Sequence, residues 1–227
     1  MQLPAPLYLP FLLGAVAQAA PLEQAAQAAQ AIAAAPAECG ARLISMSYSG
    51  NGCPQGSASK AYDAAINSNR WFFDGISAEI GRGGDQSDKS TACQVHLQIA
   101  TNAGWAFTLK GKNSGSNAMT SKVNIGGGVS ANYLTTYYFS SDATDTTTVK
   151  YSISGPKSGE VTVYDPAPGQ NYPRSECGGG LMNINHRVAL TSTSTSGAGT
   201  MELYGDGGSG PQNSNWVPWG AFEWVRC

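Results

Sequence analysis

The sequence predicts an all-β domain, a two-sheet antiparallel β-sandwich or jelly-roll-like fold bridged by disulfides. Many short runs alternate apolar and polar residues with a period of two, the pattern of strands that bury one face. Turn signals rich in Gly and Pro separate several of these runs, without an amphipathic helical pattern between them. Charged residues make up only 12% of the 227 residues and there are 28 glycines, which is typical of a neutral extracellular β protein.

The clearest alternation lies in residues 93–112. Val95, Leu97 and Ile99 are apolar, whereas Gln94, His96 and Gln98 between them are polar. A second run, 105–109, follows the connection Asn102-Ala103-Gly104, where Asn and Gly accept positive φ. We expect the two runs to form a β-hairpin with one buried face and one wet face.

The remaining strands follow from the same pattern. A first strand is expected where Ile44, Met46 and Tyr48 alternate with serines, ended by the Gly- and Pro-rich loop 50–56. Two short apolar runs come next, at 71–73 and 76–80. Beyond the hairpin, strands are predicted at 119–125, 129–139, 149–153, 160–164, 181–190, 200–204 and 222–227.

The N-terminal region predicts secretion into the extracellular space. Residues 1–19 fit a signal peptide, because an apolar run at 7–16 precedes an A-x-A cleavage site at Ala17-Gln18-Ala19, although the first basic residue is Arg42. The run holds about ten apolar residues, and a membrane span takes roughly 20. Residues 20–38 form an Ala/Gln-rich leader or pro-segment, with a helix packed on the domain as the alternative. Residues 39–227 then make up a single β-sandwich domain.

A set of motifs follows in fixed order along the domain. It comprises Gly52-Cys53-Pro54-Gln55-Gly56-Ser57, Cys93-Gln94 leading to Gly104-Trp105-Ala106-Phe107, Tyr137-Tyr138-Phe139-Ser140, Cys177-Gly178 before residues 181–185, and the terminal Trp224-Val225-Arg226-Cys227. This set resembles the fungal secreted family labelled domain of unknown function 4360, over roughly residues 43–227. The resemblance implies a secreted, cysteine-bridged domain and brings no assigned catalytic residues.

The resemblance also implies a disulfide pairing. Cys53 would pair with Cys93, and Cys177 with Cys227, which leaves the extra cysteine, Cys39, free. Sequence alone fixes no connectivity. Cys39 bonded to one of these partners, or to a second chain, stays open as the alternative.

The sequence lacks the motifs that are typical of several functional classes. The net charge is −2 and the 13 Lys and Arg are scattered, so we expect no nucleic-acid partner. We see no nucleophile elbow, P-loop or nucleotide fingerprint. We expect His96 to point to solvent and His186 to be a satisfied core histidine, in phase with Met182 and Ile184. Neither has a second ligand at metal spacing, so no metal or cofactor is expected.

Carboxylates and aromatics suggest two different functions. Nearly all of the candidate acids lie beside turn residues, so we assign no catalytic residue; they are Asp74, Glu79, Asp85, Glu160, Asp165, Glu176, Asp206 and Glu223. Trp216 and Trp219 are expected in a loop beside Asn213 and Asn215, a combination of rings and amides that suits sugar stacking. The alternative for most of the rings is core packing.

The resulting expectation is a non-catalytic extracellular or cell-wall-associated binding protein. Its partner would be a cell-wall polysaccharide or a host surface, in a glycan-binding or host-directed effector role. Two alternatives remain from the sequence: a small secreted hydrolase acting on polysaccharide, and a structural wall protein without a small ligand.

Overall fold

The structure is a computed structural model, and it describes residues 30–31, 35–54, 58–63, 68–73, 76–81, 89–109, 117–165, 171–204, 214–218 and 222–227. It confirms the all-β class. The elements are β1 (Gln30–Ala31), the 3-10 turn η1 (Ala37–Cys39), β2 (Arg42–Ser49), β3 (Ala58–Asp63), β4 (Ser68–Phe73), β5 (Ser77–Ile80), β6 (Ser90–Ala100), β7 (Trp105–Leu109), β8 (Asn117–Ile125), β9 (Val129–Phe139), β10 (Asp142–Ser154), β11 (Lys157–Asp165), β12 (Gly179–Ser192), β13 (Gly199–Tyr204), β14 (Ser214–Pro218) and β15 (Phe222–Arg226).

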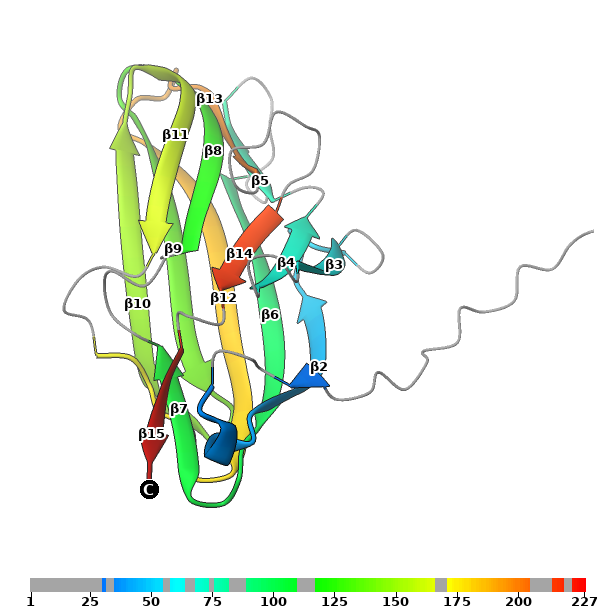
Figure 1. The fold of residues 1–227 in the computed structure, drawn as a ribbon. Coiled ribbons are helices and arrows are strands. Elements are labelled where there is room, and N and C mark those ends of the chain that lie inside the picture. Colours follow the sequence, from blue (N-terminus) through cyan, green and yellow to red (C-terminus); the bar gives the residue numbers. More distant parts are fainter. Residues whose placement is uncertain are drawn as a thin grey trace, which may run out of the picture.

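The strands form two layers, as a sandwich requires (Figure 1). One layer is a six-stranded sheet in the order β1-β2-β6-β12-β9-β10, with every pair antiparallel. Three smaller sheets lie in front of it in Figure 1: β11-β8-β13-β5, β14-β4-β3 and β15-β7. The long strand β12 lies at the centre of the large sheet because it pairs with both β6 and β9.

The core fills the space between the layers. In β6 and β9 every second residue is buried, which confirms the alternation expected for this part of the chain. The ring of Phe107 lies 5.2 Å from that of Phe139 and 5.7 Å from that of Phe222, so the six-stranded sheet and the β15-β7 pair share one core. The face of the large sheet turned away from this core is left to carry polar side chains.

The expected hairpin at residues 93–112 is wrong. β6 pairs with β2 and β12, whereas β7 pairs with β15 in the other layer. The connection is tight, since the Trp105 backbone N–H donates to the Asn102 carbonyl at 2.9 Å, but the backbone of Gly178 bonds to both Thr101 and Trp105 and separates the two strands. Trp105, Ala106 and Phe107 are buried consecutively, so β7 has no wet face.

The first strand also differs from its expected pattern. Leu43 lies opposite Ile99 and Ser45 opposite Gln98, so two residues of β2 span one step of β6 and Ile44 is the extra residue of a bulge. Ile44 is 40% exposed, while Leu43, Met46 and Tyr48 pack partly against the core. The prediction that Ile44 shares a face with Met46 is therefore wrong.

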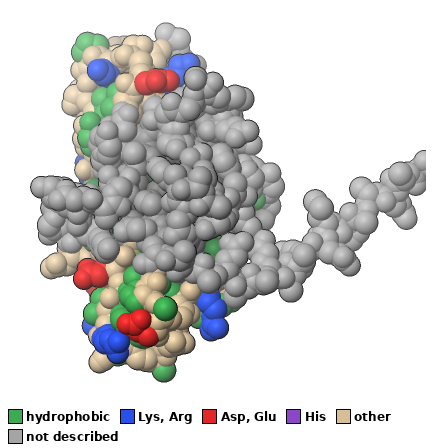
Figure 2. Space-filling view, in the orientation of Figure 1, with side chains coloured by type: hydrophobic (Ala, Val, Ile, Leu, Met, Phe, Trp, Pro, Cys, Tyr) green, Lys and Arg blue, Asp and Glu red, His purple; other side chains and the backbone are tan. Residues whose placement is uncertain are grey.

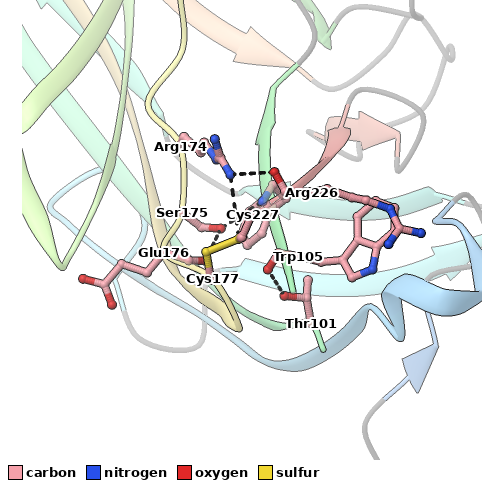
Figure 3. The surroundings of a disulfide bond; sticks show 9 residues. Thr101, Trp105, Arg174, Ser175, Glu176, Cys177, Arg226 and Cys227 are labelled. Carbon is pink, nitrogen blue, oxygen red and sulfur yellow. Dashed lines mark hydrogen bonds between the residues drawn. A yellow bond between two sulfur atoms is a disulfide. The ribbon is translucent and has the colours of Figure 1, made fainter. Parts of the chain in front are cut away.

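Two disulfides hold the chain. Cys53 is bonded to Cys93 and ties the loop after β2 to β6, and Cys177 is bonded to Cys227 and ties the C-terminus to the turn before β12 (Figure 3). These are the pairs that the family resemblance implied. Cys39 is free and buried.

The N-terminal expectations fall mostly outside the described part of the chain. The proposed signal peptide, residues 1–19, lies outside it entirely. Within the leader, Gln30 and Ala31 pair with Leu43 and Arg42, and η1 begins at Ala37. Among the residues that the structure describes, no helix has the length and hydropathy to cross a bilayer.

Candidate functional site

The outer face of the six-stranded sheet carries ordered rows of polar side chains. These rows exist because the positions between the buried residues of β6, β9 and β12 are mostly Asn, Gln, Ser, Thr and Tyr. The strand register brings them opposite one another: one row holds Ser47, His96, Asn183, Tyr138 and Thr146, and the next holds Ser49, Gln94, Asn185, Thr136 and Thr148. We call these two rows the polar face.

Asn183 is the hub of this face. Its Oδ1 accepts from Gln94 Nε2 at 3.2 Å and from His96 Nδ1 at 2.7 Å, and its Nδ2 donates to Ser140 Oγ at 2.8 Å. Gln94 Nε2 also donates to the Tyr138 hydroxyl at 2.8 Å. Although it belongs to the outer face, Asn183 is 2% exposed because these neighbours cover it. Their side chains are thus held in fixed positions on rigid strands.

His96 lies on the outer face as expected, but it is a member of this network. Since Nδ1 faces a carbonyl oxygen, Nδ1 carries the proton, and Nε2 accepts from Ser49 Oγ at 3.0 Å. Sequence reasoning assigned no role to Asn183, and outside the family motif it named Tyr138 only among the aromatic residues on strands rich in Thr, Ser and Asn. The amide-rich alternation of residues 181–185 and 94–98 is visible in the sequence, but the register that places the two segments opposite each other is not.

His186 is a core histidine, as predicted. It is fully buried, with its ring stacked on that of Tyr133, and the Tyr133 hydroxyl lies 2.8 Å from Nδ1. Desolvation by burial lowers the pKa of His186 to about 3, so the ring is neutral throughout the physiological range. A neutral, enclosed imidazole is a structural group.

The described carboxylates lie mainly on surfaces and in turns. Glu160 and Glu202 lie on either side of Lys122 in one row of the outer face of the β11-β8-β13-β5 sheet. Hydrogen bonds from Thr144, first its hydroxyl and then its backbone N–H, hold the pKa of Asp142 below its usual value, the opposite of what a general acid needs. Asp74, Asp85 and Asp206 lie outside the described residues. In the described part of the chain, no group of three or more His, Cys, Asp or Glu side chains is placed to hold a metal ion.

The expected C-terminal site is only partly described. Asn215 and Trp216 lie in strand β14, where Trp216 is opposite Arg70 of β4, so the prediction that Trp216 belongs to a loop is wrong. An extended segment of five residues can pair with β4 in spite of Pro218, because the proline comes at the end of the strand. Asn213 and Trp219 lie outside the described residues.

Two shallow depressions flank the turn between β12 and β13. One, of about 320 Å³, is lined by Glu79, Asn124, Ser196, Thr200 and glycine backbone, and the other, of about 420 Å³, by Lys89, Thr193 and Thr195 among others. Both offer hydroxyl and peptide groups, and the lining of each is more polar than apolar. Neither encloses a pair of opposed carboxylates among its lining residues.

Fold, cysteines and site define a class: a secreted, disulfide-bridged all-β domain. The chain belongs to the family described as Domain of unknown function (DUF4360), whose model matches residues 40–227. An "Uncharacterized secreted protein" of Arthroderma benhamiae (strain ATCC MYA-4681 / CBS 112371) is 28% identical over 160 residues, which cover 70% of this chain and 63% of that relative. The match thus spans less than two thirds of the relative's length.

Secretion agrees with the chemistry, since two disulfides require an oxidising compartment. A solved structure, TmCBM61 in complex with beta-1,4-galactotriose, is 10% identical, with a TM-score of 0.19 and coverage of 80% of this chain and 88% of that one. A likeness this low carries no argument about fold or ligand.

Proposed function

We propose that this secreted domain is a non-catalytic binding protein for extracellular glycan, presented by a cell wall or a host surface. The observation that carries the proposal is the polar face, where amide, imidazole and phenol groups are fixed around Asn183. Sugars offer hydroxyl edges that act as donors and acceptors together, and preorganised planar polar groups bind such edges at low entropic cost.

The polar face also has hydrogen-bonding capacity left over. Oδ1 of Asn185, in the row next to Asn183, is buried without a hydrogen-bond partner. A bound water or a ligand hydroxyl that reaches it after a shift of the neighbouring side chains would satisfy it, as buried acceptors generally require. Tyr138, at the far end of the network, adds a half-buried ring on which a pyranose face can pack.

The C-terminal segment is the second surface in this proposal. Trp216, Trp219, Asn213 and Asn215 combine rings and amides, and we retain them as candidate ligand-binding residues. We propose further that residues 1–19 are a signal peptide, that the leader 20–38 is removed or remains as an extension, and that nucleic acid is not a partner.

Retention of the secreted protein on insoluble cell-wall polysaccharide tests the proposal. Gln94→Ala removes the donor that holds Tyr138 and Asn183 in place, and we expect retention to fall about tenfold, as the loss of about one hydrogen bond to the ligand would give. Asn124→Ala is the matched control, because Asn124 is an exposed amide on the outer face of the other layer. Equal retention of both variants would overturn the assignment to the polar face.

The same assay separates the alternatives. If Gln94→Ala binds as the wild type does but Trp219→Ala does not, the C-terminal segment is the binding surface. The hydrolase alternative rests on Glu160 and Glu202 flanking Lys122. It predicts that incubation with polysaccharide releases reducing sugar, and that Glu160→Gln or Glu202→Gln stops the release.

A further inference from the structure

The outer face of the six-stranded sheet is one-sided in charge. Three cations lie on it, Arg42, Lys150 and Arg187, all exposed. The paired outward positions of β2, β6, β9, β10 and β12 hold no carboxylate in the part of the chain that the structure describes. Asp142 and Asp145 lie at the turn after β9, beyond the last regular row at Tyr138 and Thr146.

Two of these cations belong to a single row beside the polar face. Arg187 lies opposite Leu134 on one side, and Lys150 lies opposite Leu134 on the other. Since neighbouring strands are about 4.8 Å apart, the Cα atoms of the two cations lie roughly 10 Å apart with a half-buried leucine between them. A sugar ring that packs on this leucine would have a charged group at either side.

The two cations are available to a ligand. Nε of Arg187 donates to Ser90 Oγ at 2.7 Å, which orients the guanidinium. Within the described residues, neither Arg187 nor Lys150 has a carboxylate within ion-pair distance. An oriented guanidinium binds a carboxylate through two parallel N–H···O bonds, a geometry that a neutral sugar does not use.

The other layer has the opposite balance. The outward positions of the β11-β8-β13-β5 sheet hold Glu79, Glu160 and Glu202 against Lys122. Figure 2, which views the molecule from the side of the smaller sheets, shows acidic and basic side chains near one another at both ends of the described surface. The segregation of positive charge is therefore a property of the large sheet and not of the molecule as a whole.

Resting on the proposed function, we infer that the glycan bound by this face is acidic, a polysaccharide that carries uronate carboxylates. Arg187 and Lys150 would bind carboxylates, Leu134 would lie under the ring between them, and the rows around Asn183 would bind the hydroxyls. The absence of described carboxylates on the face removes the repulsion that such a ligand would otherwise meet.

Binding of the purified protein to polygalacturonate and to its fully methyl-esterified form tests this inference. The two polymers share a backbone and differ in charge. We expect polygalacturonate to bind at least about tenfold more tightly, in line with one charge-assisted hydrogen-bond pair, and its affinity to fall as salt rises. The double variant Arg187→Gln, Lys150→Gln should lose this preference and most of the salt dependence.

The control is the double variant Lys122→Gln, Lys157→Gln, which changes the net charge equally on exposed residues of the other layer. It should bind as the wild type does. A thermal melt of each variant checks folding, and the salt dependence of the wild type requires no variant at all.

The outcomes separate the two proposals. If the methyl-esterified polymer binds as tightly as polygalacturonate, glycan binding stands and the acidic ligand is wrong. If neither these polymers nor any cell-wall polysaccharide binds, both proposals fail. If a DNA duplex or anionic vesicles bind as tightly as polygalacturonate, the face attracts polyanions in general, and recognition of uronate is overturned.

Discussion

His186 shows at the scale of one residue how a core can depend on pH. The ring is fully buried beside Tyr133, and burial holds its pKa at about 3, against 6.5 for an exposed histidine. Between these pH values the unfolded chain binds a proton that the folded chain rejects. The stability that His186 contributes is therefore complete above pH 6.5 and is lost as pH falls towards 3.

We predict that His186→Asn reduces the pH dependence of folding. The asparagine oxygen can still accept from the Tyr133 hydroxyl, but it takes up no proton. The wild type should lose on the order of 5 kcal/mol from this residue between pH 6.5 and 3. Urea unfolding across this range measures the effect. Parallel pH profiles for both proteins above pH 5, where few carboxylates titrate, would contradict the prediction.

Cys39 is a second group whose chemistry is set by burial. Desolvation raises the pKa of its thiol, and the neighbouring Glu38 acts in the same direction. Because the thiolate is the reactive form, we predict that the native protein does not react with a thiol reagent within minutes, and that one thiol per chain reacts after unfolding in urea. A second reactive thiol in urea would mean that a disulfide is missing.

For single residues, the sequence predicted the features that depend only on the alternation of buried and exposed positions along one strand. His186 could be placed in the core because it shares a period with Met182 and Ile184. Asn183 could not be recognised as a hub, because its partners Gln94, His96 and Ser140 come from distant parts of the chain and meet only through strand register. Register between non-adjacent strands has no local signal.

The bulge in β2 gives a test at the scale of one element. Ile44 is the extra residue, so its deletion places Leu43 and Met46 two residues apart on one face, opposite Ile99 and Leu97. We predict that this deletion changes the free energy of unfolding by about 1 kcal/mol or less, because no core side chain changes face.

Deletion of Met46 is the control. It leaves the bulge in place and turns every later residue of β2 to the opposite face, so Tyr48 would leave the core. Thermal denaturation of both deletion variants measures the difference. Equal losses of stability would show that the bulge itself is required.

The failed hairpin prediction has a reason at the same scale. The turn at residues 102–104 was recognised correctly, but turn chemistry alone does not decide whether the two strands pair. β12 lies beside β6, and Gly178 is hydrogen-bonded to Trp105 at the start of β7; both come from later in the chain. Strand β9 was predicted with its observed bounds because its alternation is regular over its whole length.

At the scale of the molecule, the Cys177–Cys227 disulfide closes a loop with a sequence separation of 50 residues (Figure 3). Both cysteines are exposed, so serine in their places buries no new polar group. We predict that Cys177→Ser, Cys227→Ser lowers the free energy of unfolding by about 4 kcal/mol, because the unfolded chain gains loop entropy.

The urea midpoint of the oxidised wild type and of this variant measures the loss. After reduction with dithiothreitol both proteins should lose further stability, because the Cys53–Cys93 disulfide remains in each before reduction. An unchanged midpoint in the variant would mean that other contacts hold β15 to β7, such as the Arg226 guanidinium 4.6 Å above the Trp105 ring.

The sequence predicted the all-β fold class from the periodicity of its apolar residues, and the family resemblance implied the pairing of the cysteines. The division of the smaller layer into three sheets was not, because β3 and β14 have weak alternation and acquire their pairing only through β4. The polar face could not be predicted from the sequence either, since it exists only once five strands are aligned.

The two register shifts described in the large sheet have one more consequence. Register shifts occur between Leu43 and Ser45 in β2 and between Asp142 and Thr146 in β10, which lie at or next to the two edges of the sheet. A straight edge of unpaired peptide groups is a template on which another chain can add a strand, and a bulge twists that template out of line. Each shift thus makes one end of a margin a poorer template for added strands, which matters for a protein released into a medium without chaperones.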